Sequence, residues 1–468
     1  MPIEVHNTLG RRREEFTPGK PGEVTLYVCG PTVYRELHIG NFRAFVVFDT
    51  VARYLEYRGH RVHRVQNFTD IDDKMINRAQ ELGIGVPELA QRYIEVYFAD
   101  ADALRVRRAE VHPRATEHIP EILELCRVLQ DKGHAYQVGG DLYFAADSFP
   151  GYGKLSGQDL AQLEAGARVE VDERKRRPAD FALWKAQKPG EPAWDSPWGK
   201  GRPGWHIECS AMAMRYLGHP VDIHAGGADL IFPHHENEIA QSEAATDGPF
   251  VRYWMHNGYL NLEGRKMSKS LGNVLTVSEL RHSFSPEEIR FFLISAHYRS
   301  PLNYSPELLQ AAAGGLERLR TVLTRLGELH AQAGEIPTEA DQAFRGRLAA
   351  ARQEFEAAMD ADFNTADALA ALFELTREVN QRLSTANSRP LLQEVAALYR
   401  ELGGVLGLLE EEQTEELDSD LQRLVQARER ARAVRDWAEA DRIRAQLRDR
   451  GVVLEDTAQG VRWKRSRS

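Results

Sequence analysis

The pattern that most constrains this chain's fold is a strand, a helix and a second strand near the N-terminus. Residues 24–29 (VTLYVC) are mostly apolar, aromatic or β-branched and end at a Gly-Pro pair, which predicts a buried strand. From Asn41 to Tyr57 apolar residues recur at helical spacing, and Gly59 follows where a helix should stop. Residues 62–65 begin a second strand. This order predicts a βαβ unit, and therefore a parallel sheet whose ligands bind at the carboxyl ends of the strands.

Composition sets the broad class of the protein. The chain has 468 residues, of which 42% are hydrophobic and 28% charged, an ordinary globular composition with room for about three domains. Three cysteines (Cys29, Cys126 and Cys209) give no disulfide framework and fit a reducing compartment. The N-terminal sequence has no apolar signal region, and no apolar run approaches the roughly 18 residues of a membrane span. We therefore expect a cytoplasmic protein without membrane contact.

Later stretches differ in composition from the βαβ unit. Residues 110–200 are less regular and rich in Pro, Gly and Trp, which indicates an insertion in the sheet domain. Residues 305–408 nearly lack Pro and carry Ala, Leu, Glu and Arg at helical spacing, which predicts a helical bundle. Residues 421–468 are basic although the whole chain has a net charge of −10, an asymmetry that favours nucleic-acid binding. We predict an α/β fold with a Rossmann-like parallel-sheet domain over 1–300, an insertion at about 110–200, a helical bundle over 301–409, and a linker with a small basic module over 410–468.

A first short motif, residues 38–41 (HIGN), lies at the start of the predicted helix. Helix N-termini present unpaired N–H groups and a positive dipole end, so they attract phosphate. Gly40 permits close approach of a ligand, and His38 and Asn41 can donate hydrogen bonds to phosphate oxygens. The residues alone leave a second interpretation open, in which Asn41 caps the helix and His38 is a surface residue.

A second motif, residues 266–270 (KMSKS), lies in a glycine-flanked loop more than two hundred positions later. Its lysines, Lys266 and Lys269, and its serines offer positive charge and hydroxyl donors. Such groups stabilise the charge that builds on a departing pyrophosphate in the transition state. The alternative is an ordinary basic, solvated loop, and the presence of the first motif on the same chain argues against it.

Together, in this order, the two motifs resemble the signatures of the class I aminoacyl-tRNA synthetases. The first motif here ends in Asn41, where the general family pattern ends in His. Asn41 can still donate a hydrogen bond to phosphate, but it cannot carry a positive charge. Longer segments resemble the cysteinyl-tRNA synthetases in particular: residues 27–34 (YVCGPTVY), 67–73 (NFTDIDD), 204–210 (GWHIECS), 232–239 (FPHHENEI), 454–457 (LEDT) and 462–463 (RW). The resemblance covers most of the chain. It implies ATP-dependent ligation of L-cysteine to tRNA(Cys) through a cysteinyl adenylate, with Mg²⁺ accompanying ATP.

Cys29, Cys209, His234 and Glu238 are candidate metal ligands. Two thiolates, an imidazole and a carboxylate suit zinc. Spacing supports only His234 and Glu238, which are four positions apart and would share one face of a helix. Taken alone, the two cysteines fit ordinary buried residues as well. The resemblance assigns all four to one Zn²⁺ per chain, whereas Cys126 lies in an apolar helical run and is expected to be structural.

Zinc would serve recognition in such an enzyme. Serine is almost isosteric with cysteine, and a pocket that relies on packing separates such analogues by only about 10²-fold. Zinc binds a thiolate far better than a neutral hydroxyl and deprotonates a bound thiol. The resemblance therefore implies that zinc recognises the substrate thiolate and makes a separate editing domain unnecessary.

The resemblance also assigns the remaining site residues. It places Gly30, Thr69, Trp205 and His224 around the amino acid. It gives the ATP contacts as His38, Gly40, Asn41, Gly226, Gly227, Asp229 and Lys269, and the catalytic groups as His38, Asn41, Lys266 and Lys269. Trp205 fits a core aromatic equally well, and His235 and Glu236 are either supports of the metal site or ordinary helix residues.

In the tail, Trp463 stands among basic residues, a combination suited to stacking on an unpaired base. The resemblance implies that this module reads the anticodon, with Asp456 and Arg462 as candidate base contacts. Phosphate contacts should make the binding salt-dependent.

Three other functions fit the sequence less well than a tRNA ligase. A ligase that joins cysteine to an amino sugar, as in mycothiol synthesis, shares the activation chemistry, but a small acceptor needs neither the helical bundle nor the basic tail. A zinc hydrolase is disfavoured because residue 239 is Ile, so the HExxH pattern is absent. A noncatalytic RNA-binding module leaves both phosphate motifs unexplained. We expect the enzyme to be a monomer.

Overall fold

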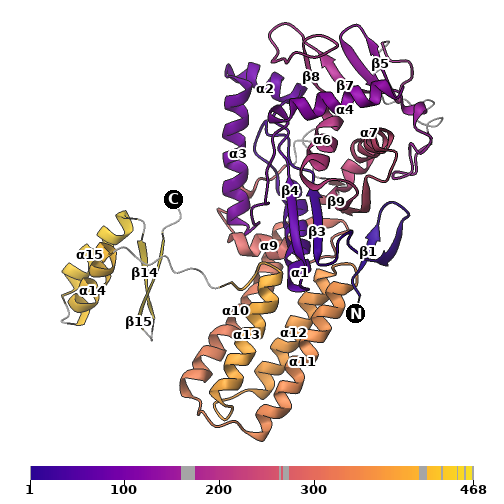
Figure 1. Ribbon diagram of the computed structural model, residues 1–468. Coiled ribbons are helices and arrows are strands. Elements are labelled where there is room, and N and C mark those ends of the chain that lie inside the picture. Colours follow the sequence, from indigo (N-terminus) through magenta and orange to yellow (C-terminus); the bar gives the residue numbers. More distant parts are fainter. Residues whose placement is uncertain are drawn as a thin grey trace. The chain divides into compact units, whose positions relative to one another are not determined.

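The computed structural model in Figure 1 describes residues 2–159, 174–262, 265–266, 274–410, 419–433, 436–450, 452–457 and 460–465. The chain forms two compact units, Met1–Leu409 and Glu410–Ser468. None of the described helices is long and apolar enough to cross a membrane.

A parallel sheet with the strand order β10-β9-β3-β4 organises the first unit. Its strands are β3 (Glu23–Val28), β4 (Arg61–Gln66), β9 (Val221–Gly227) and β10 (Val251–Asn257). Helix α1 (Ile39–Tyr57) connects β3 to β4, so the predicted βαβ unit is confirmed. The two strands β9 and β10 are buried along almost their whole length, because both faces of a parallel sheet are covered. The predicted fold class, an α/β protein with a parallel sheet, is also confirmed.

Helices and a small hairpin surround this sheet. They are β1 (Glu4–Asn7), β2 (Arg12–Glu15), α2 (Asp73–Leu82), α3 (Val86–Ala103), α6 (Trp205–Leu217) and α7 (Glu236–Thr246). Local signals set their ends: the Asp72 side chain accepts from the Met75 N–H at 2.8 Å at the start of α2, and Gly83 ends that helix with a φ of 67°.

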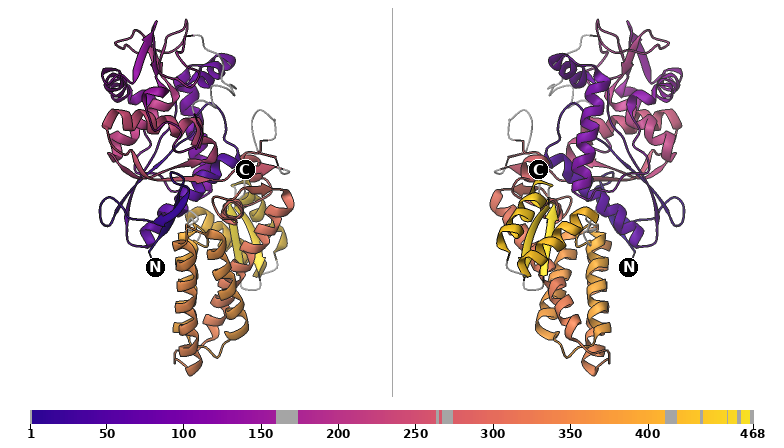
Figure 2. Two further views of the ribbon diagram at one scale, coloured as in Figure 1. Left: turned by 90° about the vertical axis from the view of Figure 1, so that its right-hand side faces the viewer. Right: turned by 90° about the vertical axis from the view of Figure 1, so that its left-hand side faces the viewer.

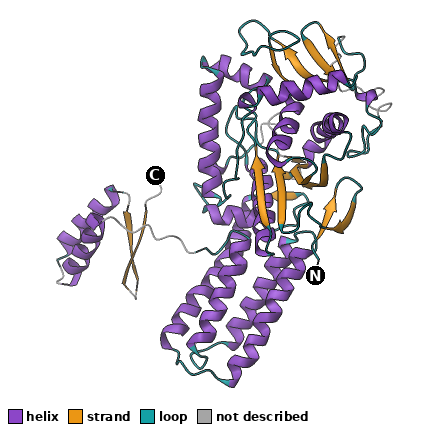
Figure 3. Ribbon diagram, viewed as in Figure 1, coloured by secondary structure: helices purple, strands orange, loops and turns teal. Residues whose placement is uncertain are grey.

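The insertion is more regular than the sequence predicted. It contains η1 (Ala115–Glu117), α4 (Ile119–Asp131), β5 (Ala135–Val138), β6 (Asp141–Phe144), η2 (Ala146–Ser148), β7 (Phe181–Ala186) and β8 (Gly201–Pro203). The four strands form an antiparallel sheet, drawn in orange in Figure 3. They share a core with α4 that includes Cys126, Phe144 and Trp184. These strands could not be recognised in the sequence because strands this short carry too few alternations of apolar and polar residues. Cys126 is fully buried in this core, which agrees with the structural role expected from the sequence.

The four-helix bundle lies at the other end of the first unit from the insertion (Figures 1 and 2). Its helices are α10 (Pro306–Gln332), α11 (Glu339–Asp360), α12 (Thr365–Arg382) and α13 (Arg389–Val405). Each begins at a side chain that accepts a backbone N–H, namely Ser305, Thr338, Asn364 and Ser388. The elements between sheet and bundle are β11 (Leu260–Leu262), β12 (Arg265–Lys266), α8 (Val277–Leu280), α9 (Pro286–Ile294) and β13 (Leu302–Tyr304).

The second unit has its own small core. It consists of α14 (Ser419–Ala433), α15 (Trp437–Asp449), β14 (Val452–Thr457) and β15 (Gly460–Arg465). Leu421, Ile443 and Leu447 pack together, and the two strands form an antiparallel hairpin. The domain boundaries proposed from the sequence stay predictions.

One buried carboxylate, Asp49 of α1, ties the sheet to the elements that lead into the bundle. It accepts from Arg53 and Arg290 at 2.8 Å each, and Arg64 lies 3.3 Å away. Burial alone would raise the pKa of Asp49, but the surrounding guanidinium groups hold it well below its usual range. Arg290 also donates to the Leu406 carbonyl at 2.8 Å, so a single side chain joins α1, α9 and the end of α13.

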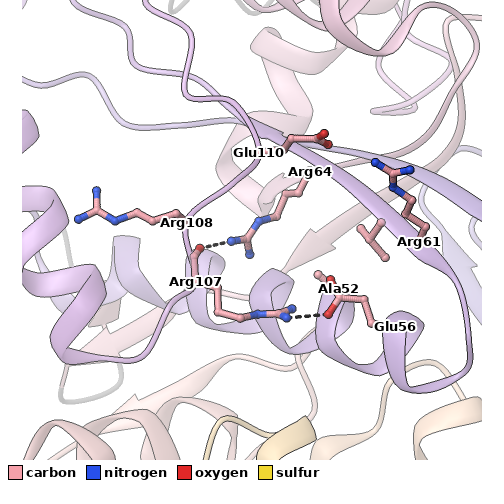
Figure 4. A pocket seen from close by; sticks show the side chains of 8 residues that line it. Ala52, Glu56, Arg61, Arg64, Arg107, Arg108 and Glu110 are labelled. Atoms are coloured by element: carbon pink, nitrogen blue, oxygen red, sulfur yellow. Dashed lines mark hydrogen bonds and ion pairs between the residues drawn. The ribbon is translucent and has the colours of Figure 1, made fainter.

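Arg64 and Arg107 also line a pocket of about 270 Å³ near the amino end of β4 (Figure 4). Arg107 is paired with Glu56 at 2.6 Å, and Arg108, another lining residue, is paired with Asp102 at 2.6 Å. Most of the positive charge here is therefore neutralised within the fold, and the pocket lies at the edge of the sheet opposite the carboxyl ends.

Replacing Asp49 by Asn should lower the free energy of unfolding by about 3–5 kcal/mol, because it leaves several buried guanidinium groups without their carboxylate. A depressed pKa stabilises the fold above the unfolded value near 4, and this contribution is lost as the pH falls toward the folded pKa. Urea unfolding at pH 7 and near pH 3 should therefore show a difference between wild type and variant that narrows in acid. Asp102→Asn, which breaks a half-exposed ion pair, is the matched control and should cost less than about 1 kcal/mol. Equal effects of the two substitutions would contradict the role given to Asp49.

Candidate active site and metal centre

The candidate site lies where the parallel strands end. Cys29 directly follows β3, Thr69 lies just beyond β4, and His224 lies in β9. Carboxyl ends of parallel strands meet at one edge of the sheet, so three segments distant in sequence come together. Two further segments join them: α6, which carries Cys209, and the turn η4 (Ile231–His235) leading into α7, which carry His234 and Glu238.

Cys29, Cys209, His234 and Glu238 form one buried cluster whose ligand atoms all lie within 4.8 Å of one another. The two sulfurs are 3.9 Å apart, and Cys29 Sγ lies 3.6 Å from Glu238 Oε1. His234 Nε2 lies 3.0 Å from the same oxygen, as expected for residues four apart on a helix. None of the four is more than 6% exposed.

These separations fit a tetrahedral metal ion. With metal–sulfur bonds of about 2.3 Å and metal–oxygen bonds of about 2.1 Å, two sulfurs should lie roughly 3.8 Å apart and sulfur and oxygen roughly 3.6 Å apart. A disulfide would need sulfurs about 2.05 Å apart, and the structure has both cysteines free. Thiolates with an imidazole and a carboxylate are the donors that zinc prefers. The residues therefore fit the metal that the resemblance implies.

A second, overlapping group was not predicted as a ligand set. His224 Nε2 and His235 Nε2 lie 3.4 Å and 3.3 Å from Cys29 Sγ, and these three side chains form a buried group with Glu238. The Nδ1 atom of His235 lies 2.7 Å from Nε2 of His256, so a hydrogen bond between the two rings fixes the orientation of His235. No motif or spacing in the sequence indicates that His256, on β10, lies beside this group. Of the two groups, the one with two sulfurs offers zinc the softer donors.

The charges of the cluster follow from burial and proximity. Burial raises the pKa of the Cys29 thiol well above its usual range, whereas the hydrogen bond from Cys29 lowers the pKa of Cys209 to about 6. Burial opposes the charged forms of Glu238 and His234. Attraction to His224 and His234 nevertheless lowers the pKa of Glu238 to about 2, and attraction to Glu238 raises the pKa of His234 to about 10. Near neutral pH, Cys209 and Glu238 are therefore anionic donors that suit a cation.

Aromatic and hydroxyl side chains surround the cluster. The Trp205 ring stacks on His234 with centroids 4.6 Å apart and is 38% exposed, so it is a wall of the site and not the core aromatic of the alternative interpretation. His224 packs between Tyr27 at 4.9 Å and Trp254 at 4.5 Å. Thr69 lies 2% exposed with its hydroxyl donating to Glu208 at 3.0 Å.

Glu236 contrasts with Glu238, its neighbour two positions on. Its carboxylate accepts from the backbone N–H groups of Gly153 at 2.9 Å and Ser156 at 2.7 Å, which anchors the chain that follows η2 within the insertion. Both of its oxygens are therefore used in the fold, and Glu236 is not placed among the metal ligands.

The first phosphate motif opens helix α1. The helix begins at Ile39 with His38 as its N-cap and no side-chain cap bond, so the interpretation of Asn41 as the cap is wrong. Asn41 lies in the first turn, and its Oδ1 is buried without a hydrogen-bond partner among the described residues. The Ile39 N–H donates to the Leu275 carbonyl at 2.8 Å, which binds the chain just after the second motif to the first.

The second motif is described only at its start. Lys266 ends β12 and pairs with Asn261 of β11. Its side chain, and the whole of Lys269, lie outside the described residues.

Glycines allow the backbone to pass closely beneath this edge of the sheet. A Cβ atom on Gly30 would lie 1.6 Å from the Asn67 carbonyl oxygen, and one on Gly227 would lie 2.4 Å from Asp229 Oδ1. One on Gly226 would lie 2.8 Å from Leu230 in the 3-10 turn η3 (Ala228–Leu230). Any side chain at Gly30 would displace the chain beside Cys29.

Comparisons with known proteins identify the family. Residues 15–314 match the family model described as the tRNA synthetases class I (C) catalytic domain, residues 354–410 a DALR domain, and residues 414–463 the cysteinyl-tRNA ligase anticodon binding domain. The cysteine--tRNA ligase of Symbiobacterium thermophilum is 57% identical over 471 residues, which cover 100% of both chains. The chain belongs to the cysteinyl-tRNA synthetase family. The resemblance found in its motifs is confirmed.

Solved structures of other synthetases share the fold of this cysteinyl-tRNA synthetase family member. A Mycobacterium tuberculosis methionyl-tRNA synthetase has a TM-score of 0.59 at 16% identity, covering 82% of this chain and 89% of its own. LeuRS from Agrobacterium radiobacter K84 has a TM-score of 0.60 at 15% identity, covering 84% and 86%. All four cluster residues and both phosphate motifs lie within the segment that matches the catalytic-domain model.

Asp456 and Arg462 lie on the hairpin of the second unit, where Asp456 pairs with Val461 and Arg462 with Glu455. Their side chains, and that of Trp463, are outside the described residues. Their suggested contacts with bases stay predictions.

Proposed function

We propose that this enzyme activates L-cysteine with ATP and Mg²⁺ and transfers the cysteinyl group to the terminal adenosine of tRNA(Cys). ATP-dependent ligation of cysteine to tRNA follows from membership of the family, at 57% identity over the whole chain. The observation that carries the mechanism is the buried Cys29–Cys209–His234–Glu238 cluster at the sheet edge where ligands of such sheets bind.

In the activation step the cysteine carboxylate attacks the α-phosphorus of ATP. A carboxylate oxygen–phosphorus bond forms, the bond to the bridging oxygen breaks, and pyrophosphate leaves. The first turn of α1, with His38, Gly40 and Asn41, is proposed to bind phosphate, and Lys266 and Lys269 are proposed to stabilise the charge on the leaving group. Gly226, Gly227 and Asp229 are proposed to lie beneath the adenosine, with Asp229 accepting from a ribose hydroxyl.

The cluster is proposed to hold one Zn²⁺ through Cys29, Cys209, His234 and Glu238. When bound, zinc supplies a soft Lewis acid that prefers the thiolate of cysteine to the hydroxyl of serine. Trp205 and His224 are proposed to enclose the amino-acid side chain, and Gly30 and Thr69 to contact its backbone. Support comes from the stacking of Trp205 on the ring of His234 and from the 3.4 Å separation of His224 and Cys29.

The acceptor is tRNA, and the amino-sugar alternative is not favoured because residues 414–463 match an anticodon binding domain. A cytoplasmic location and a monomeric state stay predictions. Aminoacylation of tRNA with labelled cysteine tests the function directly, and labelling of an amino sugar in place of tRNA would overturn it.

Lys269→Ala should slow adenylate formation by about a hundredfold while raising the KM for cysteine less than threefold. A group that acts on charge developing in the transition state lowers kcat more than it weakens substrate binding. Rapid-quench measurement of cysteinyl adenylate checks this. Lys20→Ala removes a lysine whose side chain is 83% exposed and forms an ion pair with Glu23 at the surface, and this substitution should have no effect. A KM effect of Lys269→Ala that matches or exceeds its rate effect would contradict the assignment.

A further inference from the structure

Glu208 is a buried carboxylate that no step above uses. It is 0% exposed and lies on α6 between Trp205 and Cys209. Positions three and four apart share one face of a helix, so α6 presents an aromatic wall, a carboxylate and a candidate metal ligand toward the same site. Its Oε2 accepts from the Thr69 hydroxyl at 3.0 Å, and its Oε1 has no hydrogen-bond partner among the described residues.

A buried carboxylate with one unpaired oxygen is costly to the fold. Glu236, buried just as completely, differs because both of its oxygens accept backbone N–H groups. Among the described residues, Glu208 accepts no backbone N–H group. Its hydrogen bond is to the side chain of Thr69, which lies beside the cluster. This contrast indicates a role at the site, beyond holding the chain together.

Substrate geometry explains why Thr69 needs a fixed orientation. The α-ammonium of cysteine is three bonds from its sulfur, so a thiolate held at the cluster requires acceptors for the ammonium close by. Two hydrogen bonds of 3.2 Å fix the Thr69 backbone beside the chain that follows β3. Its N–H donates to the Pro31 carbonyl, and its carbonyl accepts from the Val33 N–H. When its hydroxyl proton is donated to Glu208, the lone pairs of the same oxygen remain available to accept.

We propose that Glu208 is a positioning residue for cysteine, which directs the Thr69 hydroxyl proton away from the substrate so that the oxygen accepts from the α-ammonium. This role rests on the proposed function and adds a residue to it. Glu208 acts through Thr69 because, among the described residues, the hydrogen bond that its carboxylate accepts comes from the Thr69 hydroxyl.

A double-mutant cycle on cysteine-dependent ATP–pyrophosphate exchange tests this role. Glu208→Ala should raise the KM for cysteine about tenfold, the size expected for one hydrogen bond to a charged group, with the KM for ATP, kcat and metal content unchanged. Glu208→Gln should stay within about threefold of wild type because its amide oxygen still accepts from Thr69. In a Thr69→Val background Glu208→Ala should add less than twofold, since the group it orients is gone.

Controls separate this role from a general effect on the fold. Glu287 is another buried carboxylate, 7% exposed, and it accepts from the Leu409 N–H at 2.6 Å outside the site. Glu287→Gln should therefore leave the KM for cysteine unchanged. If the alanine variant does not fold, Glu208→Leu, which fills the space without an acceptor, replaces it in the cycle.

Additive effects of the two substitutions, or loss of metal with Glu208→Ala, would overturn the role of Glu208. Failure of the unaltered enzyme to exchange with cysteine would contradict the proposed function instead. The two failures are therefore distinguishable.

Discussion

Cys209→Ser is expected to remove the bound metal and to lower cysteine-dependent ATP–pyrophosphate exchange by at least a hundredfold in the same preparation. Cys209 Sγ lies 3.9 Å from the sulfur of Cys29, in a cluster sealed from solvent. A serine hydroxyl is not ionised at neutral pH and is a poor ligand for zinc, so the cluster loses one of its two soft donors. Metal assay and exchange kinetics on purified protein provide the measurement.

The matched control for this substitution is Cys126→Ser. Cys126 is also free and fully buried, but it lies in the core of the insertion with its sulfur 4.0 Å from the Leu183 carbonyl. Burying a hydroxyl there should cost some stability and leave metal content and exchange unchanged. Full metal and activity in Cys209→Ser, or equal losses in both variants, would remove Cys209 from the metal site.

Deletion of residues 410–468 is expected to lower aminoacylation of tRNA at least a hundredfold while exchange with cysteine stays within about threefold of wild type. These residues form a compact unit of their own, and residues 414–463 match an anticodon binding domain. The cluster and both phosphate motifs lie in the first unit, so activation does not need the deleted part. Exchange and aminoacylation assays on the same preparation measure the two activities.

Salt dependence adds a second readout for the deletion. Removal of a basic tRNA-binding module should reduce the slope of log K for tRNA against log salt concentration, because fewer phosphates are neutralised. The thermal unfolding of residues 1–409 serves as the control for an intact first unit. Equal loss of exchange and aminoacylation in a folded truncated protein would contradict the modular organisation.

Local signals in the sequence predicted much of the fold. The strand before Cys29 and the helix ending at Tyr57 follow from apolar runs and periodicity, and the structure moves the helix start only from Asn41 to Ile39. The strands of the insertion could not be recognised, because β5 and β6 are four residues each and β8 is three. Pairing between strands this short depends on tertiary contacts that no window of sequence contains.

The site was only partly predictable for a related reason. The i, i+4 relation of His234 and Glu238 is local, and the structure brings their side chains to 3.0 Å. Cys29 and Cys209 are 180 positions apart, so only the parallel sheet and α6 bring them together. The approach of His235 to Cys29, and the contact of His235 with His256 on a neighbouring strand, likewise depend on how β9, β10 and η4 pack.

The most direct test of the account is amino-acid-dependent ATP–pyrophosphate exchange with cysteine and with serine, on protein whose zinc content has been assayed. The account predicts exchange with cysteine alone, lost when the metal is removed and restored when zinc is returned. Exchange that persists without metal, or that serine supports equally well, would contradict recognition of the thiolate by the Cys29–Cys209–His234–Glu238 cluster.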